Sequence, residues 1–484
     1  MNATKKHTRE GCYDAIVVGS GPGGAITAYL LAQSGQNVLL IEEGNVFKSD
    51  AFVPFSLEEI NKKYRDHGYN ILFGKPNIPY VEGCCVGGGS EINSGLYHRT
   101  PDHILHLWET QFGIHDISSQ SMGAHFIEIE NDLKISRSSI IPPSSQLIYD
   151  SAIDLGWHAE ETQRWVSNAI NPTDPSQAIH RRSMSKTYIP KFVSAGGQLR
   201  PNTKVARIGQ RNNRWYVNCT EKNDHQVQFS SQYLFLCAGA IQTPFILQKS
   251  GIKTNIGMTL KCHPMLKVVA KFPEKINDQN MGVPMHQVTE FLPEFILGCS
   301  ISTLPFLALG LIHYPNTLKT LISDWHTMAI YHITIHSETN GKIHALPGID
   351  TPLIRYNLTK NDLALLSKGY QKITRLLLNA NASHIYFNLK NHPIISSSLL
   401  NQNSNSNDLL TLNNILLSTV HVMGSCPMGF NSRTSATDSF GKVHNVKNLF
   451  INDSSLFPSS IGVNPQGTVM ALARRNVLNF INQL

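Results

Sequence analysis

A glycine-rich turn near the amino terminus constrains the fold of this chain more than any other feature of the sequence. Residues 13–18 (YDAIVV) predict a short buried strand, a helix is expected over about 24–34, and residues 37–41 (NVLLI) predict a second strand. Between the first strand and the helix, three glycines stand at the spacing GxGxxG: Gly19, Gly21 and Gly24. Strand, turn, helix and strand form a βαβ unit, which predicts an α/β fold with a parallel sheet.

Each glycine of this turn has its own part in binding a dinucleotide. Gly19 allows the tight turn, Gly21 lets backbone amides approach a pyrophosphate, and Gly24 lets the helix pack closely on its strand. Glu42 ends the second strand about 20 residues later, where its carboxylate can accept hydrogen bonds from both hydroxyls of a ribose. The pattern predicts a dinucleotide site and leaves FAD and NAD open. A glycine-rich turn without any ligand is the alternative.

Composition narrows the class of protein. The 484 residues are enough for roughly three domains of about 150 residues, and the content of 15% charged and 41% hydrophobic residues predicts a soluble globular protein. The net charge of +7 is spread over single and paired basic residues, so we expect no nucleic-acid partner. The eight cysteines contain no CxxC pair, and the amino terminus lacks a signal-peptide pattern, which predicts reduced thiols and a cytoplasmic location.

Three other stretches are interpreted as scaffold or surface. Residues 295–312 run without a charge, at the lower length limit of a membrane span, but a proline, two glycines and three hydroxyl-bearing residues favour a buried segment. Thr359 and Asp362 resemble a capping box ahead of an amphipathic helix, and residues 396–414 are rich in Ser and Asn, as in a solvated linker.

No metal site is expected. His332 and His336 fall on one face of a predicted strand, but four residues of strand separate their Cα atoms by about 13 Å, too far to share one metal ion.

Three further blocks carry the remaining chemical signal. Residues 83–93 (GCCVGGGSEIN) are crowded with glycine, so their backbone can pass close to a planar or phosphorylated group. Residues 239–244 (GAIQTP) directly follow a predicted apolar strand over 233–237. The third block spans residues 421–429 (HVMGSCPMG) and continues through residues 453–466.

With the amino-terminal turn, these blocks resemble the glucose-methanol-choline (GMC) family of FAD-dependent oxidoreductases over nearly the whole chain. Gly89 and Lys253 depart from the usual family signatures. The resemblance implies a Rossmann-like FAD-binding domain interleaved with a substrate domain built on a six-stranded antiparallel sheet. The expected FAD-binding parts are residues 1–100, 185–260 and 415–484, and the expected substrate-binding parts are residues 101–184 and 261–414.

The same resemblance assigns the catalytic residues. His421 matches the family's active-site histidine, and an imidazole with an ordinary pKa near 6.5 can take a hydroxyl proton while hydride passes to flavin N5. Asn464 matches the second active-site position, where its amide can donate to the substrate oxygen. Asn464 before Pro465 also fits a helix N-cap followed by proline at the first helical position, with the positive end of the helix facing the flavin.

The same resemblance implies further FAD-binding positions. Asn93 and Ser94 match residues that lie against the isoalloxazine ring, Val205 matches the residue whose main chain bonds adenine, and Asp453 matches the acid near phosphate and ribitol. The remaining cofactor positions are Gly87, Gly88, Ser90 and Pro465. Ile92 stands where some members attach FAD through a histidine, so FAD is expected to bind non-covalently. Cys426 is interpreted as a packing residue.

The substrate is expected to be a lipophilic alcohol. The uncharged residues 295–312 can line an apolar tunnel or touch a membrane surface, and residues 336–362 resemble long-chain alcohol oxidases and sterol-oxidising relatives. Sugars, polyols and choline remain alternatives, and so does another reaction class, a flavin-dependent lyase or photodecarboxylase. A non-enzymatic flavoprotein fold is a further alternative. The electron acceptor, O₂ or a quinone or other carrier, is left open.

Overall fold

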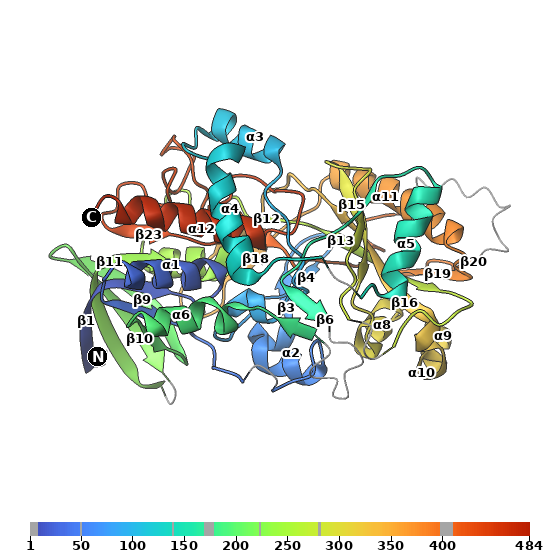
Figure 1. The fold of residues 1–484 in the computed structure, drawn as a ribbon, viewed down its shortest axis with the longest axis horizontal. Coiled ribbons are helices and arrows are strands. Elements are labelled where there is room, and N and C mark those ends of the chain that lie inside the picture. The colour runs from blue at the N-terminus through green and yellow to red at the C-terminus, as the bar shows by residue number, and fades with distance from the viewer. Residues whose placement is uncertain are drawn as a thin grey trace.

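Two β-sheets lie in opposite halves of the molecule, with the carboxyl-terminal helix along one of them (Figure 1). The computed structural model describes residues 8–48, 51–137, 140–168, 179–221, 224–278, 282–396 and 410–484. This mixed architecture confirms the predicted fold class, a Rossmann-like half combined with an antiparallel half.

The first sheet has seven strands in the order β8-β2-β1-β11-β10-β9, with β23 also paired to β11. Their bounds are β1 Thr8–Val18, β2 Val38–Ile41, β8 Gln198–Arg200, β9 Thr203–Arg211, β10 Arg214–Glu221, β11 Gln226–Leu236 and β23 Leu449–Ile451. β1 pairs in parallel with β2 and β11, whereas β9, β10 and β11 form an antiparallel meander. Because β1 has a partner on each side and layers on both faces, residues 15–18 are all buried, which explains their continuous apolar run.

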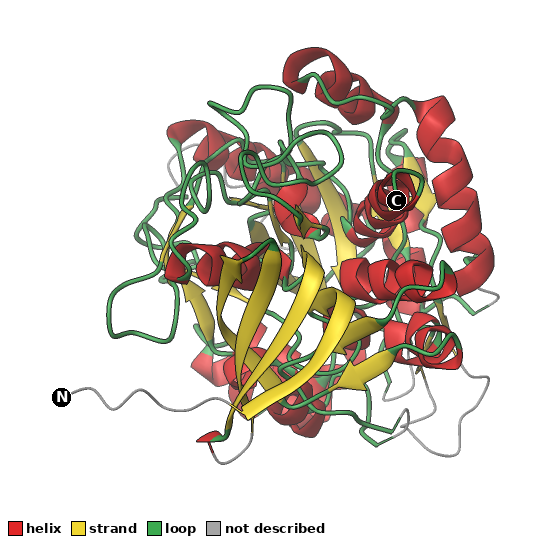
Figure 2. Cartoon of the chain, turned by 90° about the vertical axis from the view of Figure 1, so that its left-hand side faces the viewer, coloured by secondary structure: helices red, strands yellow, loops and turns green. Residues whose placement is uncertain are grey.

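The predicted βαβ unit is present. α1 (Pro22–Gln33) follows β1 through the glycine turn, and Gly35 in a left-handed conformation lies just beyond its end. β1 begins at Thr8, earlier than the predicted start at residue 13, with a bulge between Arg9 and Cys12. The last helix, α12 (Gln466–Ile481), packs beside α1, the helix that follows the glycine turn (Figures 1 and 2).

The second sheet is antiparallel, in the order β20-β19-β13-β16-β15-β14-β5, with β21 also paired to β13. Its strands are β5 Ala159–Glu161, β13 Met265–Lys271, β14 His286–Val288, β15 Phe295–Ser300, β16 Met328–Ile335, β19 His384–Phe387, β20 Ile395–Ser396 and β21 Leu417–Ser418. The sheet therefore has eight strands and not the expected six, because strands of two or three residues extend its edges.

Two helices cover one face of this second sheet. α5 (Pro143–Asp154) and α11 (Lys360–Asn379) pack against each other and against β14, β15 and β16. The predicted capping box is confirmed: the Thr359 hydroxyl accepts from the Asp362 amide at 3.1 Å, and the Asp362 carboxylate accepts from the Thr359 amide at 2.8 Å.

The uncharged stretch of residues 295–312 folds into β15 and then α8 (Leu304–Gly310). β15 confirms the predicted burial, since it lies between β14 and β16 and residues 295–299 are buried. α8 is only partly buried, and Leu309 is 61% exposed. In the part of the chain that the structure describes, no helix is both long and apolar enough to cross a membrane. Most of the predicted linker, residues 397–409, lies outside the described residues.

The remaining elements connect the two halves. They are α2 Leu57–Lys63, β3 Asn70–Leu72, β4 Ile78–Tyr80, α3 Asp102–Phe112, α4 Ser119–Leu133, β6 Val166–Asn168, β7 Ile179–Arg181, α6 Tyr188–Ser194, α7 Gly239–Lys249, β12 Lys261–Cys262, α9 Pro315–Lys319, α10 Leu321–Asp324, β17 Lys342–His344, β18 Leu353–Arg355 and β22 Val422–Met423. α4 packs on α12 in the first half, whereas α5 packs on the second sheet. The expected domain boundaries remain a prediction.

Candidate active site

A cavity of about 1070 Å³ extends from the glycine turn to the second sheet. At one end it is lined by the turn, Glu42 and Val205, and at the other by residues of β13, β15 and β16. His421 and Asn464 also line it. The cavity therefore joins the predicted cofactor residues to the predicted catalytic residues.

The glycines of the turn separate into two kinds. Gly19 has a φ of +96°, and a Cβ there would lie 2.4 Å from the Cys237 carbonyl oxygen; a Cβ on Gly24 would lie 1.8 Å from the Gly19 carbonyl oxygen. No described atom lies within 4 Å of the position that a Gly21 Cβ would take, and Gly21 lines the cavity. Gly21 is also the N-cap of α1 and provides no side-chain cap. The open face of Gly21 and the uncapped amides of α1 fit a dinucleotide pyrophosphate.

Glu42 lies at the cavity with a partly occupied carboxylate. It accepts hydrogen bonds from the Ser20 amide at 3.0 Å, the Ser20 hydroxyl at 2.7 Å and the Gly44 amide at 2.8 Å. A carboxylate has about four acceptor positions, so one remains for a ribose hydroxyl, where the sequence predicted two bonds. Burial raises the pKa of Glu42, and the three donors oppose that rise.

The second glycine segment packs against the first. Gly87 and Gly88 both have left-handed φ angles, and a Cβ on Gly88 would lie 2.9 Å from the Gly21 Cα. Gly88 lines the cavity, whereas Gly87 donates to the Ser20 hydroxyl at 3.0 Å. The Ser90 hydroxyl donates to the Gly87 carbonyl at 2.7 Å and accepts from the Met184 amide at 2.9 Å, so Ser90 stabilises the shape of this turn.

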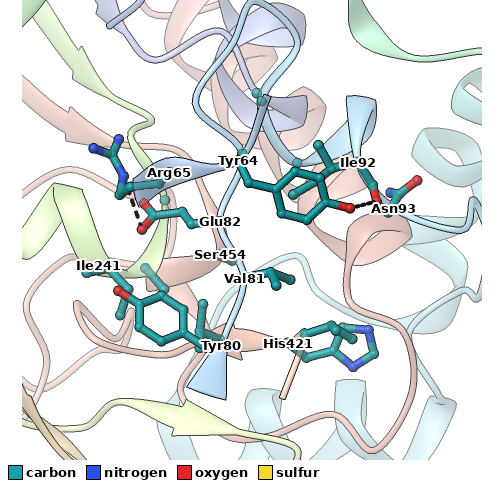
Figure 3. Close-up of a pocket in the computed structure, with 18 of the residues that line it drawn as sticks. Tyr64, Arg65, Tyr80, Val81, Glu82, Ile92, Asn93, Ile241, His421 and Ser454 are labelled. Atoms are coloured by element: carbon teal, nitrogen blue, oxygen red, sulfur yellow. Dashed lines mark hydrogen bonds and ion pairs between the residues drawn. The ribbon is translucent and has the colours of Figure 1, made fainter. Parts of the chain in front are cut away.

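Asn93 and Ile92 line the cavity (Figure 3). Ser94 lines it as well. The Asn93 amide group donates to the Gln466 side-chain oxygen, while its own oxygen accepts from the Gly95 amide at 3.0 Å. Figure 3 shows the Tyr64 hydroxyl directed at the Ile92 backbone carbonyl, to which it donates at 3.2 Å. Ile92, which stands where the family resemblance places a histidine in some members, has an alkyl side chain.

Val205 and Asp453 line the same cavity from β9 and from the segment after β23. The Asp453 carboxylate accepts from the Gly239 amide at 2.9 Å, the Thr243 hydroxyl at 2.6 Å and the Ser455 amide at 2.8 Å. Burial raises the pKa of Asp453, and these donors oppose the rise. Asp453 thus ties the start of α7 to the carboxyl-terminal block.

The two predicted catalytic side chains meet. The Asn464 amide nitrogen lies 3.4 Å from His421 Nε2, and His421 Nδ1 lies 3.1 Å from Nδ1 of His263. His263 Nε2 in turn lies 2.8 Å from the Ser460 hydroxyl oxygen. One set of tautomers satisfies every contact: His421 Nδ1 donates to His263 Nδ1, and His263 Nε2 donates to Ser460. The lone pair of His421 Nε2 then faces Asn464.

Both histidines are neutral at neutral pH. Burial, followed by the charges that His98 and His332 would carry, lowers the pKa of His421 to about 3. Burial also lowers the pKa of His263 well below its ordinary value. A neutral imidazole whose Nε2 carries a lone pair is the form that can accept a proton.

The position of Asn464 corrects one expectation. α12 begins at Gln466, with Pro465 as its N-cap and no side-chain cap, so Asn464 does not cap the helix. Its side chain bonds His421 instead. Pro465 lines the cavity, as predicted for a residue beside the cofactor.

His263 was missed by the sequence reasoning, as were His98, His332 and Lys267. His263 and Lys267 lie four residues apart on the segment that enters β13, and both line the cavity with His332 of β16. The sequence pattern that could have indicated these residues is the placement of polar residues at alternate positions among apolar ones. This pattern marks the polar face of a strand.

Two cysteines, Cys237 and Cys299, line the cavity. All eight cysteines are free, and Cys426 is buried, with its pKa raised by burial. Across the described ranges, no group of His, Cys, Asp and Glu side chains is arranged to hold a metal ion.

Sequence comparison decides the family. The amino-terminal and carboxyl-terminal profiles of the GMC oxidoreductases match residues 13–265 and 338–473. The chain belongs to the GMC oxidoreductase family. This GMC oxidoreductase is 30% identical to an uncharacterized GMC-type oxidoreductase of Sinorhizobium fredii, over 96% of this chain and 93% of the relative. It is 25% identical to a long-chain-alcohol oxidase of Arabidopsis thaliana (97% and 69%) and 22% identical to a cholesterol oxidase of Acinetobacter baumannii (96% and 93%).

Solved structures agree with this fold. Formate oxidase of Aspergillus oryzae superposes with a TM-score of 0.76 at 15% identity, over 98% of this chain and 99% of that one. An FAD-dependent oxidoreductase of Chaetomium thermophilum gives a TM-score of 0.74 at 15% identity, over 98% and 100%. GMC oxidoreductases depend on FAD, and the chain is accordingly an FAD-dependent oxidoreductase of the kind that acts on CH–OH donors.

Proposed function

We propose that this enzyme oxidises the CH–OH group of an alcohol with a largely apolar body, with His421 as the base. The observation that carries the proposal is the neutral, partly buried His421, whose Nε2 lone pair faces Asn464 inside the cavity. Apolar side chains from both halves line the cavity beyond this pair, among them Leu96, Ile296 and Phe306.

The residues act on the alcohol as follows. His421 Nε2 accepts the hydroxyl proton, and the Asn464 amide donates a hydrogen bond to the oxygen as negative charge develops there. His263 accepts the hydrogen bond from His421 Nδ1 and so stabilises the imidazolium that forms. When bound, FAD supplies the acceptor for the hydride that leaves the carbon.

The residues proposed to bind FAD are those of the glycine turn with Glu42, Val205, Asn93, Ser94 and Asp453. The alkyl side chain of Ile92 provides no nucleophile, which supports non-covalent binding. Removal by mild acid or chaotrope, with FAD recovered in the supernatant of the precipitated protein, tests this point.

An apolar mouth supports a lipophilic substrate. Leu57, Tyr69 and Leu309 line the cavity and are 61%, 85% and 61% exposed. Exposed apolar side chains around an opening favour a ligand that brings its own apolar surface, or contact with a membrane surface. The names of the relatives, a long-chain-alcohol oxidase and a cholesterol oxidase, point to the same class.

An anaerobic titration tests the proposal. Purified FAD-loaded enzyme is mixed with 1-alkanols, sterols, sugars or choline, and loss of visible flavin absorbance is followed. We expect 1-alkanols or sterols to reduce the flavin. Reoxidation by air or by an added quinone then identifies the acceptor. Reduction by sugars or choline alone would replace the apolar alcohol, and reduction by dithionite but by no alcohol would favour lyase or light-driven chemistry.

A further inference from the structure

Lys267 extends from β13 into the cavity without a charged partner. It is partly exposed there, and its ammonium lies 5.5 Å from the centre of the Phe306 ring. Within the described ranges, no carboxylate lies within ion-pair distance of Lys267. By contrast, Lys63 bonds Glu59 at 3.0 Å, and Lys261 bonds the Glu338 carbonyl at 2.7 Å. Lys267 is therefore a partly buried amine at the cavity wall without a counter-charge among the described residues.

The strands beside Lys267 place polar groups around it. Lys267 lies opposite His332 of β16, and His332 lies opposite Gly298 of β15. The absence of a side chain at Gly298 leaves room for the His332 ring, since a Cβ there would come within 2.7 Å of His332 Nε2. The Ser300 hydroxyl lies 3.1 Å from His332 Nδ1. These side chains form a polar band on the floor of the cavity.

Thr334 supplies an independent sign of a ligand. It is 5% exposed, lines the cavity two residues along β16 from His332, and its buried hydroxyl has no hydrogen-bond partner among the described residues. A buried hydroxyl without a partner costs free energy unless a ligand supplies the missing bond.

The carboxylates that line the cavity lie away from the end that contains Lys267. These carboxylates all lie on segments outside the second sheet: Glu42, Glu43, Glu82, Asp224, Asp350 and Asp453. The titratable groups nearest Lys267 are histidines, and burial lowers the pKa of His332 to about 4, so it is neutral. Burial also lowers the pKa of Lys267, and a bound anion would oppose that effect.

We propose that the alcohol substrate also carries a carboxylate, and that Lys267 binds this carboxylate with help from Thr334. This inference rests on the proposed function and narrows its substrate class to hydroxy acids with an apolar chain. One ammonium with hydroxyl donors suits a monoanion, whereas a phosphate ester would call for a second cation. His263, which contacts His421, and Lys267 are separated along the chain by about 13 Å, so several methylenes would separate hydroxyl from carboxylate.

Binding of decanoate tests the site without turnover. Isothermal titration at neutral pH compares decanoate and 1-decanol on the FAD-loaded wild-type enzyme and on Lys267→Met, which keeps the length of the side chain and removes its charge. We expect the ratio of decanoate to decanol affinity to fall by about tenfold to a hundredfold in Lys267→Met. Lys271→Met is the matched control, because Lys271 is on the same strand but bonds Asp324 outside the cavity. Its ratio should equal that of the wild type.

Two further variants keep the test decisive if Lys267→Met does not fold. Lys267→Arg should retain the preference for decanoate, and Thr334→Val should weaken it. The inference is overturned if 1-decanol binds as well as decanoate to the wild-type enzyme, or if the ratio is the same in all variants.

Turnover separates this inference from the proposed function. We expect ω-hydroxydecanoate to reduce the flavin with a lower KM than 1-decanol in the wild type, and this KM advantage to be lost in Lys267→Met. Reduction by both alcohols without such an advantage contradicts the carboxylate site and leaves the oxidation of alcohols intact. Decanoate binding that depends on Lys267, without reduction by any alcohol, supports the site and contradicts the proposed oxidation.

Discussion

At the residue scale, the arrangement of His421 gives the sharpest prediction. Its Nε2 is the proposed proton acceptor, so His421→Asn should lower the rate of flavin reduction by a saturating alcohol by about 10² to 10⁴. The measurement is stopped-flow reduction without oxygen. His336→Asn is the matched control, because His336 is partly buried near the end of β16 but does not line the cavity. A loss of flavin from His421→Asn, or an equal effect in both variants, would argue for a structural role.

The pH dependence of the reaction follows from the same residue. Burial lowers the pKa of His421 to about 3, so its neutral form predominates throughout the range in which an ordinary histidine would become protonated. We therefore expect kcat/KM to show no acidic limb from this residue between about pH 5 and 8. Profiles measured with an alcohol that does not itself titrate would check this. A decline centred near the ordinary histidine pKa would contradict it.

Residue by residue, the sequence located the site unevenly. The pair His421 and Asn464 was predicted from its motif, and the structure brings the two together. His263 was not predicted, because its contact with His421 spans 158 positions of the chain, and no local pattern reports such a contact. Glu42 was predicted as an acid at the cavity, but the donors of Ser20 and Gly44 that share its carboxylate follow from the folded geometry of the turn.

At the scale of one element, two glycines of the turn into α1 allow the loss of FAD binding to be distinguished from the loss of packing in the apoprotein. Gly21→Ala meets no described atom in the protein, so the thermal unfolding midpoint of the apoprotein should remain unchanged while bound FAD per chain falls. Gly24→Ala would place its Cβ 1.8 Å from a backbone oxygen and should lower the midpoint of the apoprotein. Flavin content and thermal unfolding of both variants test the pair. Equal effects on the apoprotein would contradict the assignment.

Elements were predictable where a local pattern determines them. The strand, turn and helix at residues 13–34 and the capping box of α11 lie within short windows, and both were confirmed. The number of strands in the second sheet was wrong, because strands as short as β20 and β21 are defined only by pairing, β20 with its neighbour β19 and β21 with the distant β13. The start of α12 was displaced by one residue because the Asn464 side chain bonds His421 in place of the helix amides.

At the scale of the whole molecule, buried histidines predict sensitivity to acid. Burial lowers the pKa of His98 and His332 to about 4 and of His421 to about 3, whereas in the unfolded chain each titrates near 6.5. The unfolded state therefore binds more protons between these values. The free energy of unfolding should be constant with respect to these groups above about pH 6.5 and fall by about 1.4 kcal/mol per pH unit for each histidine below it.

One variant distinguishes the contribution of a histidine to the pH dependence of unfolding from the contribution of the carboxylates. His98 is partly buried, its Nδ1 atom is buried without a partner among the described residues, and the residue does not line the cavity. Urea unfolding of the wild type and of His98→Gln at several pH values between 5 and 6.5 should give a pH slope that is smaller in the variant by about one proton. Equal slopes would show that His98 is protonated in the folded protein.

The close packing of the glycine turn on a segment far along the chain has a consequence for biosynthesis. A Cβ on Gly23 would lie 2.0 Å from the Asn452 carbonyl oxygen, so the turn fits against a segment that is made more than 400 residues later. At about 5–20 residues per second, a ribosome needs roughly 20–90 s to travel between them. During that interval β11 lacks β23 and α1 lacks α12. Flavin loading is therefore a late event, and a nascent chain truncated before residue 449 should emerge as a colourless product.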